Sequence, residues 1–181
     1  SFAQQRLWLL DRIEPGNIAY NVPIALRVNG GLQVSALQQA ISDVINRHEG
    51  LRTVFREDEE GAYQYILPVQ RWQTEEISLS DSTDDVVFEL QRAVGQQIAY
   101  NFDLAAGPLF QSKLISVGEQ QWVYVFVAHH IVTDGWSMGL FIREVLMAYL
   151  AYTRGLPQSL PPVALQYADF AVWQRNTPDE I

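Results

Sequence analysis

The sequence of 181 residues contains no cysteine. This absence excludes a disulfide scaffold, a cysteine nucleophile and zinc–thiolate sites, and it favours a reducing compartment, which we expect to be the cytoplasm. The sequence also shows no secretory signal peptide and no apolar run of membrane-spanning length. Because the first residue is Ser1 rather than methionine, we expect the chain to be a piece of a longer protein.

Positive charge is scarce as well. Twelve Lys and Arg side chains stand against twenty-one Asp and Glu side chains, which gives a formal net charge of -9. This balance argues against a broad surface for nucleic acid or anionic membranes, although a local basic site could hold a phosphate-bearing partner. We therefore expect neither nucleic acid nor a membrane among the partners.

The motifs of several common enzyme classes are missing too. The sequence has no P-loop, no dinucleotide-binding fingerprint, no G-x-S-x-G elbow and no internal repeat. These absences argue against the commoner kinase, dehydrogenase and serine-hydrolase functions. The chain is nevertheless 48% hydrophobic, and its length fits one globular domain with a substantial core.

Apolar periodicity predicts both helices and strands along the chain. Helical spacing and capping residues predict helices at 1–14, 35–50, 86–98, 137–154 and 167–175, with Ser1 and Ser35 as N-caps, Gln4 and Gln38 completing their capping boxes, and further capping residues in 80–85. Alternation predicts strands at 20–30, 51–55, 63–68, 109–117 and 122–128, and residues 118–120 predict a short hairpin loop between the last two. The expected buried helix faces are Leu7, Leu10 and Ile13; Leu37, Ile41, Val44 and Ile45; and Val87, Leu90, Val94 and Ile98.

The most informative stretch is 122–137, WVYVFVAHHIVTDGWS. Its seven leading apolar residues predict a strand buried on both faces, and polar residues begin where this strand should end. Since side chains alternate along a strand, His129 and His130 should point to opposite sides, one reactive and one structural. Gly135, directly after Asp134, predicts a backbone conformation or a close approach that a side chain would forbid.

Three interpretations of the two histidines are open. His130 can be a general base or a hydrogen-bonding group at the mouth of an acyl-transfer site, because imidazoles titrate near neutrality. Alternatively, both histidines are core residues that hydrogen-bond to backbone. A metal site is the third interpretation, but the opposed directions of His129 and His130 argue against it, and only His48 remains elsewhere. The combination of two histidines, an aspartate and a glycine at a strand end favours the functional interpretation.

Arg52 is a further candidate residue. It lies in the apolar stretch 51–55, and a buried arginine there needs a carboxylate partner. Asp134 and Glu49 are the candidates for this partner. Asp134 is therefore predicted to be a scaffold residue paired with an arginine.

Three other cations have simpler explanations. Arg47 and His48 lie in the last turn of the second predicted helix, where the helix macrodipole favours positive charge. Arg6 precedes Leu7 and Trp8 near the chain start. We expect Arg6 either on the surface or lining a cleft.

Four ordered motifs resemble those of the condensation domains of nonribosomal peptide synthetases. SFAQQRLWLL at Ser1 resembles the family's opening motif, RHEGLRTVF at Arg47 its second, AHHIVTDGWS at Ala128 its H-H-x-x-x-D-G signature, and YADFAVW at Tyr167 its fourth. Together they span nearly the whole chain. The main departures are Ala128, where the family often has methionine, and Thr133, where serine is common.

The resemblance implies a chloramphenicol-acetyltransferase-like α/β fold (an α+β two-layer sandwich), with a mixed sheet flanked by helices. Residues 1–181 would be the N-terminal lobe, and the site would lie between it and a C-terminal lobe absent from this chain. The implied reaction is amide formation: the amine of an acceptor aminoacyl thioester attacks the thioester carbonyl of an upstream peptidyl or aminoacyl donor. Both substrates would be held by peptidyl carrier proteins.

The resemblance also implies roles for single residues. His130 would be the active-site histidine, with Gly135 close to the reacting centre. The other implied assignments are His129, Asp134 and Arg52 as structural or organising residues and Arg6, Trp136 and Ser137 as candidates for lining the substrate channel. No tightly bound cofactor and no metal are implied; the phosphopantetheine arms of the upstream and downstream carrier proteins tether the substrates, and an adenylation domain would be adjacent. The chain alone should not catalyse condensation, and its motifs look more like the type that accepts an L-configured donor.

Rival functions share parts of this pattern. A coenzyme A dependent acyltransferase has the same fold and histidine motif, but the first two motifs favour the synthetase family. An epimerisation domain is another relative, and Gly135-Trp136 after Asp134 fits condensation better. In a different class, the chain could be a catalytically silent module that docks a carrier protein, against which the presence of His130 and Asp134 argues.

Overall fold

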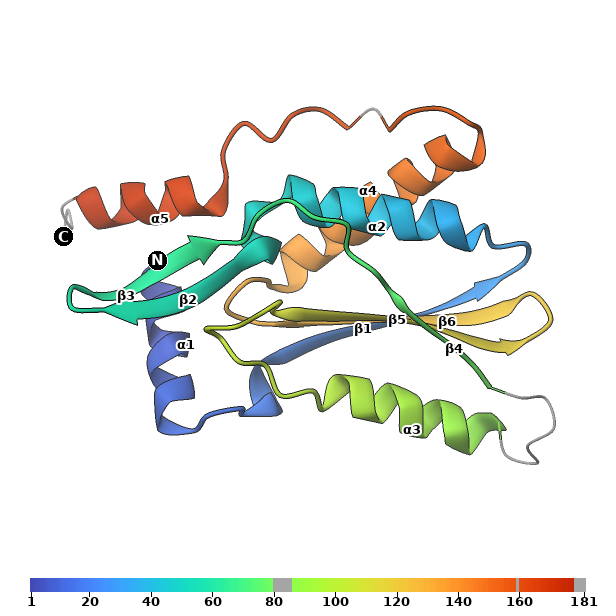
Figure 1. Ribbon diagram of the computed structural model, residues 1–181, viewed down its shortest axis with the longest axis horizontal. Helices are drawn as coiled ribbons and strands as arrows, with labels where there is room; N and C mark the ends of the chain where they lie inside the picture. Colours follow the sequence, from blue (N-terminus) through green and yellow to red (C-terminus); the bar gives the residue numbers. More distant parts are fainter. Residues whose placement is uncertain (80–85, 159, 178–181) are drawn as a thin grey trace.

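The protein is described by a computed structural model at residues 1–79, 86–158 and 160–177. A mixed four-stranded sheet forms its centre (Figure 1), with the strand order β1-β6-β5-β4. The strands are β1 (Asn21–Asn29), β6 (Gln121–His129), β5 (Phe110–Gly118) and β4 (Glu75–Ser78). Strand β6 is antiparallel to both of its neighbours, β1 and β5, whereas β4 is parallel to β5.

Strand β6 is the predicted buried strand. It lies between β1 and β5, and every residue from Val123 to His129 is buried. The short β5–β6 connection around Gln120, which has a positive φ of 53°, confirms the predicted hairpin. Strand β1 lies at an edge of the sheet, where Pro23 can be accommodated without removing a required ladder hydrogen bond.

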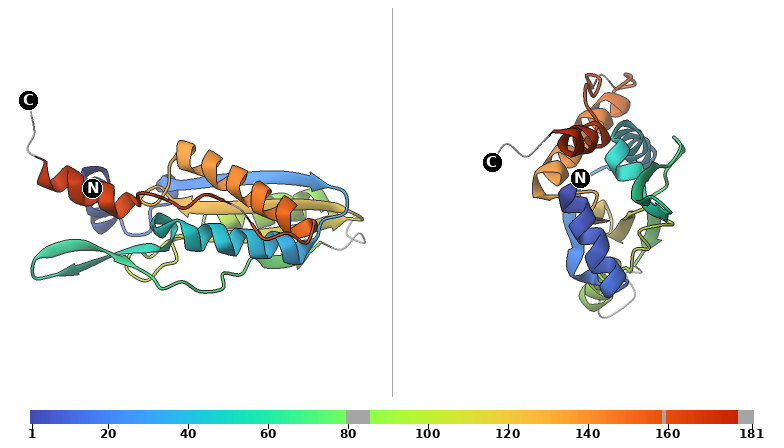
Figure 2. Two further views of the ribbon diagram at one scale, coloured as in Figure 1. Left: turned by 90° about the horizontal axis from the view of Figure 1, so that it is seen from above. Right: turned by 90° about the vertical axis from the view of Figure 1, so that its left-hand side faces the viewer.

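Helices cover both faces of the sheet. Helices α2 (Val34–Arg47) and α4 (Gly135–Thr153) lie side by side on one face, and α3 (Val86–Ile98) lies on the other (Figures 1 and 2). A mixed sheet flanked by helices, as predicted, is therefore confirmed.

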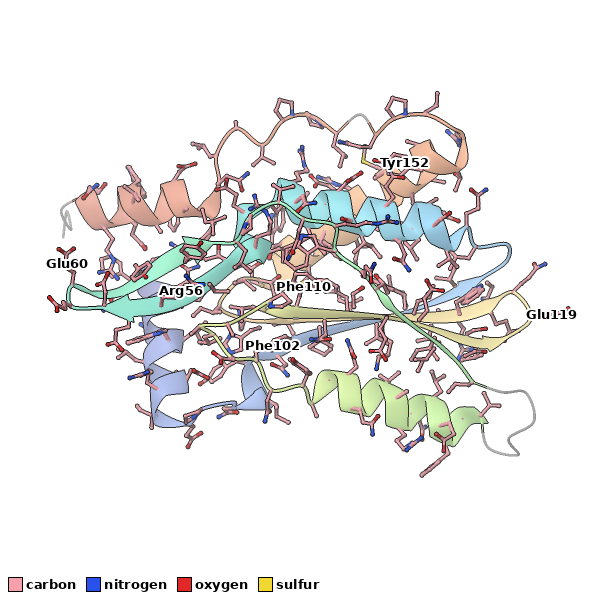
Figure 3. All side chains as sticks on the ribbon, viewed as in Figure 1. Arg56, Glu60, Phe102, Phe110, Glu119 and Tyr152 are labelled. Carbon is pink, nitrogen blue, oxygen red and sulfur yellow. The ribbon has the colours of Figure 1, made fainter. Side chains whose placement is uncertain are left out.

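The apolar side chains form one cluster on each face. Phe110 belongs to the cluster under α2 and α4, where it stacks on Phe126 at 5.6 Å between ring centroids. Phe102 belongs to the cluster on the α3 side. Figure 3 shows Phe110 and Phe102 on opposite sides of the sheet. Because both faces are packed, β6 is apolar from Trp122 to Ala128.

The remaining elements gather at one end of the sheet. They are α1 (Phe2–Ile13), the short helices η1 (Ile18–Tyr20) and η2 (Glu49–Arg52), the hairpin β2 (Thr53–Asp58) with β3 (Gly61–Ile66), and α5 (Tyr167–Asn176). The tip of the β2–β3 hairpin at Glu60 and the tip of the β5–β6 hairpin at Glu119 project in opposite directions (Figure 3). Helices α1 and α5 lie next to each other, since the Ser1 and Tyr167 hydroxyls are 3.0 Å apart.

Several local predictions are confirmed. Ser1 caps α1 and forms a capping box with Gln4. The predicted buried face of α2 is buried, and residues Leu90, Val94 and Ile98 of α3 pack against the core. The capping residues expected at 80–85 lie outside the described residues.

Other local predictions are wrong. Ile13 is 75% exposed and Leu10 is also exposed, because α1 stands at the end of the sheet and packs mainly through Leu7 and Trp8. Val87 on α3 is 66% exposed. Helix α2 begins at Val34 with Gln33 as N-cap, so Ser35 is no cap, and Gln38 bonds to Glu76 on β4 instead. The stretch 51–55 is extended only from Thr53 onward, since Leu51 and Arg52 close the η2 turn.

Candidate functional site

The two adjacent histidines at the end of β6 face opposite sides, as predicted. His129 is only 3% exposed and lies beside the rings of Tyr20 and Phe102, with centroid distances of 6.1 Å and 6.3 Å. Its Nδ1 accepts a hydrogen bond from the Ile131 amide at 3.1 Å. Burial, together with the nearby His130, lowers the pKa of His129 to about 4, so His129 is neutral at pH 7.

His130 is exposed. Its backbone amide donates to the Tyr20 carbonyl at 2.8 Å, and its Nδ1 lies 2.7 Å from the Thr133 carbonyl oxygen. A carbonyl oxygen can only accept, so Nδ1 must carry the hydrogen. In the neutral imidazole, Nε2 then carries the free lone pair. This tautomer allows His130 to accept a proton from a substrate at Nε2.

Asp134 serves α4 as its N-cap. Its Oδ1 accepts from the Ser137 amide at 2.8 Å and from the Ser137 hydroxyl at 2.8 Å. These hydrogen bonds lower the pKa of Asp134 below its usual value and keep the carboxylate ionised. The predicted pairing of Asp134 with an arginine is wrong, because a free helix N-terminus in the following turn supplies the partners instead.

Gly135 begins α4 and is exposed. A Cβ added at Gly135 would meet no atom within 4 Å, and its φ is not in the left-handed region. Within the described residues the prediction of a backbone or steric need for glycine is therefore wrong. The next residue, Trp136, is 87% exposed, and Ser137 forms the other half of the capping box.

A cavity of about 410 Å³ lies beside His130. Its walls come from the start of α1, the corner that follows α2, the loop and first turns of α4, and the segment before α5. The lining side chains include Gln4, Leu7, His48, His130, Trp136, Ser137, Met138, Phe141, Val163, Leu165 and Gln166. The cavity thus brings together the chain start, the second motif, the histidine motif and the fourth motif.

Arg6 does not contribute to this cavity. The residues of α1 that line it are Ala3, Gln4 and Leu7, whereas Arg6 is exposed outside the lining. Of the three residues predicted to line a substrate channel, Trp136 and Ser137 line this cavity and Arg6 does not. The prediction that Arg6 either lines a cleft or lies on the surface is resolved in favour of the surface.

Arg52 is buried, as predicted, and of its two predicted carboxylate partners Glu49 is confirmed. Its Nε donates to the Asn46 carbonyl at 3.2 Å, a guanidinium nitrogen donates to the Leu67 carbonyl, and Glu49 lies at 4.0 Å. Asp134 is not a partner. Arg52 therefore joins the end of α2 to the end of β3 chiefly through backbone carbonyls.

A buried carboxylate, which sequence reasoning missed, supports the cavity wall. Glu144 on α4 accepts from Arg47 Nε at 3.1 Å and from His48 Nε2 at 2.6 Å, both at the same carboxylate oxygen. The signal for Glu144 was present in the sequence. It falls on the buried stripe of α4 with Phe141 and Val145, where a charge needs a partner.

Two glutamines near the cavity were missed as well. The buried Gln4 donates to the Ile131 carbonyl at 3.2 Å, which ties α1 to the loop after His130. Gln166 binds the backbone on both sides of His48. Nothing in their local sequence distinguishes these glutamines from surface residues.

Metal-binding and membrane-spanning features are not found in the described parts of the chain. Residues 1–79, 86–158 and 160–177 hold no group of three or more His, Asp or Glu side chains suited to a metal ion. Across the same residues no helix combines the length and the hydropathy needed to cross a bilayer.

Comparison with known proteins decides the family. A family model described as "Condensation domain" matches residues 1–180. The chain belongs to the condensation domain family. It is 43% identical over 177 residues to one component of the linear gramicidin synthase of Brevibacillus parabrevis, a match that covers 97% of this chain but 2% of that relative. It is also 39% identical over 176 residues to the dimodular nonribosomal peptide synthase of Bacillus subtilis (strain 168), covering 97% of this chain and 7% of that relative.

Solved structures show the same condensation-domain fold. The X-domain in its complex with OxyB from teicoplanin biosynthesis matches with a TM-score of 0.85 and 31% identity. That match covers 96% of this chain and 36% of the other. The first condensation domain of the CDA synthetase matches with a TM-score of 0.82 and 26% identity, over 95% of this chain and 44% of that chain. This chain therefore spans less than half of these structures.

Proposed function

We propose that this chain is the N-terminal lobe of a condensation domain and carries the histidine at which a nonribosomal peptide synthetase forms an amide bond. The observation that carries the proposal is the state of His130. Its imidazole is exposed at the cavity, and the Thr133 carbonyl holds Nδ1–H so that Nε2 has the free lone pair.

The proposed reaction joins two carrier-bound thioesters. The acceptor amine nitrogen forms a bond to the donor carbonyl carbon, the carbon–sulfur bond breaks, and the donor's phosphopantetheine leaves as a thiolate. The nitrogen loses a proton, for which His130 Nε2 is the acceptor, and the thiolate gains one. A thioester is already electrophilic, so positioning of two tethered reactants is the main task of the site.

Exposed apolar side chains support the assignment as one lobe of a larger domain. They lie on α4, on the segment that follows it and on α5, and they include Leu146, Met147, Leu150, Leu156, Val172 and Trp173. A group of large apolar side chains exposed to water is typical of an interaction face. We place the C-terminal lobe against it, with upstream and downstream peptidyl carrier proteins and an adjacent adenylation domain as further partners. The 181-residue piece alone should then form no peptide.

Replacement of His130 tests this function in the intact synthetase. With both carrier proteins loaded, His130→Ala should lower the rate of amide formation by about 10²- to 10⁴-fold, the usual contribution of a general base. The melting temperature should stay near the wild-type value, because the side chain is exposed. Gln96→Ala, an exposed glutamine on α3, is the control for a neutral surface change. Amide formation by His130→Ala at the wild-type rate would refute the assignment.

A second candidate function is docking without catalysis. The similarity to an X-domain that was solved as a complex with OxyB is the observation that favours it. Such a module would use the exposed apolar face for a partner and would not need His130. The two functions separate in one measurement, since only the docking function predicts that His130→Ala leaves product formation unchanged.

A further inference from the structure

The segment 160–166 forms one wall of the cavity without any regular structure of its own. It leads from α4 to α5 and runs back along α2 (Figures 1 and 2). Pro161 and Pro162 lack an amide hydrogen, so the segment offers few backbone donors. Its position therefore depends on side-chain contacts with other elements, among them the packing of Leu160 against the core.

The Gln166 side chain makes such an attachment to the corner after α2. Its Oε1 accepts from the Glu49 amide at 3.1 Å, and its Nε2 donates to the Arg47 carbonyl at 3.0 Å. These two backbone groups lie at a helix end, where groups without an intrahelical partner occur. One side-chain amide thus binds the backbone on either side of His48.

The corner is itself fixed to α4. Glu144 accepts from both Arg47 and His48, and Arg47 also donates to the Pro161 carbonyl. A continuous set of contacts therefore runs from α4 through the corner to both ends of the segment 160–166. Removal of the Gln166 amide would release one end of the segment while the corner keeps its own ion pairs.

The side chains that this attachment places are apolar and face the reacting histidine's cavity. Val163 and Leu165 line the same cavity as His130. Leu165 is 78% exposed, so burial does not hold it in place. Apolar walls with a few polar groups are typical of sites that bind an apolar ligand group.

We propose that Gln166 is a positioning residue whose amide holds Val163 and Leu165 as the wall that receives the apolar side chain of a thioester-bound aminoacyl group. This inference rests on the proposed function, because it assigns a substrate group to the cavity of His130. It makes Leu165 a specificity-determining residue and leaves the chemical step to His130.

The test compares Gln166→Ala with Gln96→Ala in the intact synthetase. For an aminoacyl pantetheine thioester with an apolar side chain, supplied free in solution as the acceptor, Gln166→Ala should raise KM by about tenfold and leave kcat within about twofold, the pattern of lost uniform binding. Gln96→Ala should change neither quantity. An unchanged KM, or a change in KM that follows a matching fall in melting temperature, would overturn the proposal.

Leu165→Ala keeps the test decisive if Gln166→Ala does not fold. Because Leu165 is exposed, this variant should melt like the wild type. The probe is an unreactive amide analogue of an aminoacyl pantetheine thioester, titrated calorimetrically. Its Kd should rise about tenfold or more when its side chain is leucyl and little when it is seryl, as expected for lost apolar contact. If Leu165→Ala changes the Kd of both probes equally, or of neither, Leu165 does not contact the substrate side chain and the proposal is refuted.

Failure of this inference can be told from failure of the proposed function. Binding of the unreactive probe does not depend on proton transfer, whereas amide formation by His130→Ala does. If His130→Ala loses turnover while the Gln166 and Leu165 variants bind the probe like the wild type, the proposed function is supported and the role of Gln166 and Leu165 is refuted. If His130→Ala keeps turnover, the function fails whatever the probe shows.

Discussion

His129 and His130 are neighbours in the sequence, but the regions around them are built differently. The inner region surrounds His129 with aromatic and aliphatic side chains, and its imidazole receives a hydrogen bond from a backbone amide. In the cavity region, His130 lies close to the capping carboxylate of Asp134, and the wall is supported by the hydrogen bonds of Glu144 with Arg47 and His48. One residue beyond the end of β6, the surroundings change from a packed interior to an open cavity.

The difference shows how the chain can hold a reactive group without weakening its core. Packing stabilises the inner region, and it keeps His129 neutral. Helix caps and ion pairs shape the cavity region, where charge can stay close to water. Substitutions in the two regions should therefore change the free energy of unfolding by different amounts and with a different dependence on pH.

The largest effect is expected from the buried carboxylate of the cavity region. Glu144→Ala leaves Arg47 and His48 without their shared acceptor and should lower the free energy of unfolding by about 3–4 kcal/mol, since loss of one partner strands a buried charge. Glu89→Ala breaks the exposed pair with Arg92 and should cost at most about 1 kcal/mol. Chemical denaturation measures both, and equal losses would show that the cavity region does not depend on this ion pair.

The inner region should show its character in acid. The pKa of His129 is lowered to about 4 in the folded protein, against about 6.5 when unfolded. The unfolded chain therefore binds more protons between these values, and stability present above pH 6.5 is lost as the pH falls toward 4. The loss should reach up to about 3 kcal/mol at this one site. His129→Gln should remove that part of the pH dependence, and a variant with the wild-type slope would contradict the prediction.

The cap of α4 should have a smaller effect. Asp134→Ala removes the acceptor for the Ser137 amide and hydroxyl and should cost about 1 kcal/mol of stability. Asp134→Asn should cost much less, because asparagine is also a good N-cap. Thermal unfolding compares the two variants. Equal losses would point to an ion pair of Asp134 instead, as the sequence had suggested.

Much of the fold could be predicted because its signals are local. The apolar run of β6, the turn at Gln120 and the spacing within α2 each identify their element from a few neighbouring residues. Strand β4 gave no such signal, since its four residues include two glutamates and it forms by parallel pairing with β5. The exposure of Ile13 was equally hidden, because it depends on where α1 docks.

In the site, too, features with a local sequence signal were predictable and features that depend on distant contacts were not. Alternation along β6 was enough to predict that His129 and His130 diverge. The sequence predicted Glu49 beside Arg52, but it did not predict that Asp134 binds the amide and hydroxyl of Ser137 or that Arg52 binds mainly backbone carbonyls. Gln166 could not be found at all, because its two partners lie 117 and 119 positions away in the sequence.

The smallest effect on stability is expected at Gly135, where structure and proposed role can be separated. An added Cβ meets no atom within 4 Å, and residue 135 is helical. Gly135→Ala should thus leave the fold intact or stabilise it by about 0.5–1 kcal/mol, because alanine loses less backbone entropy than glycine on folding. If the reacting groups pass close to Gly135, as the resemblance to condensation domains implies, the same variant should lower the rate of amide formation by obstructing them. Unaltered turnover in a stabilised Gly135→Ala variant would show that the glycine is not near the reacting centre, and a loss of stability would show that the second lobe packs against it.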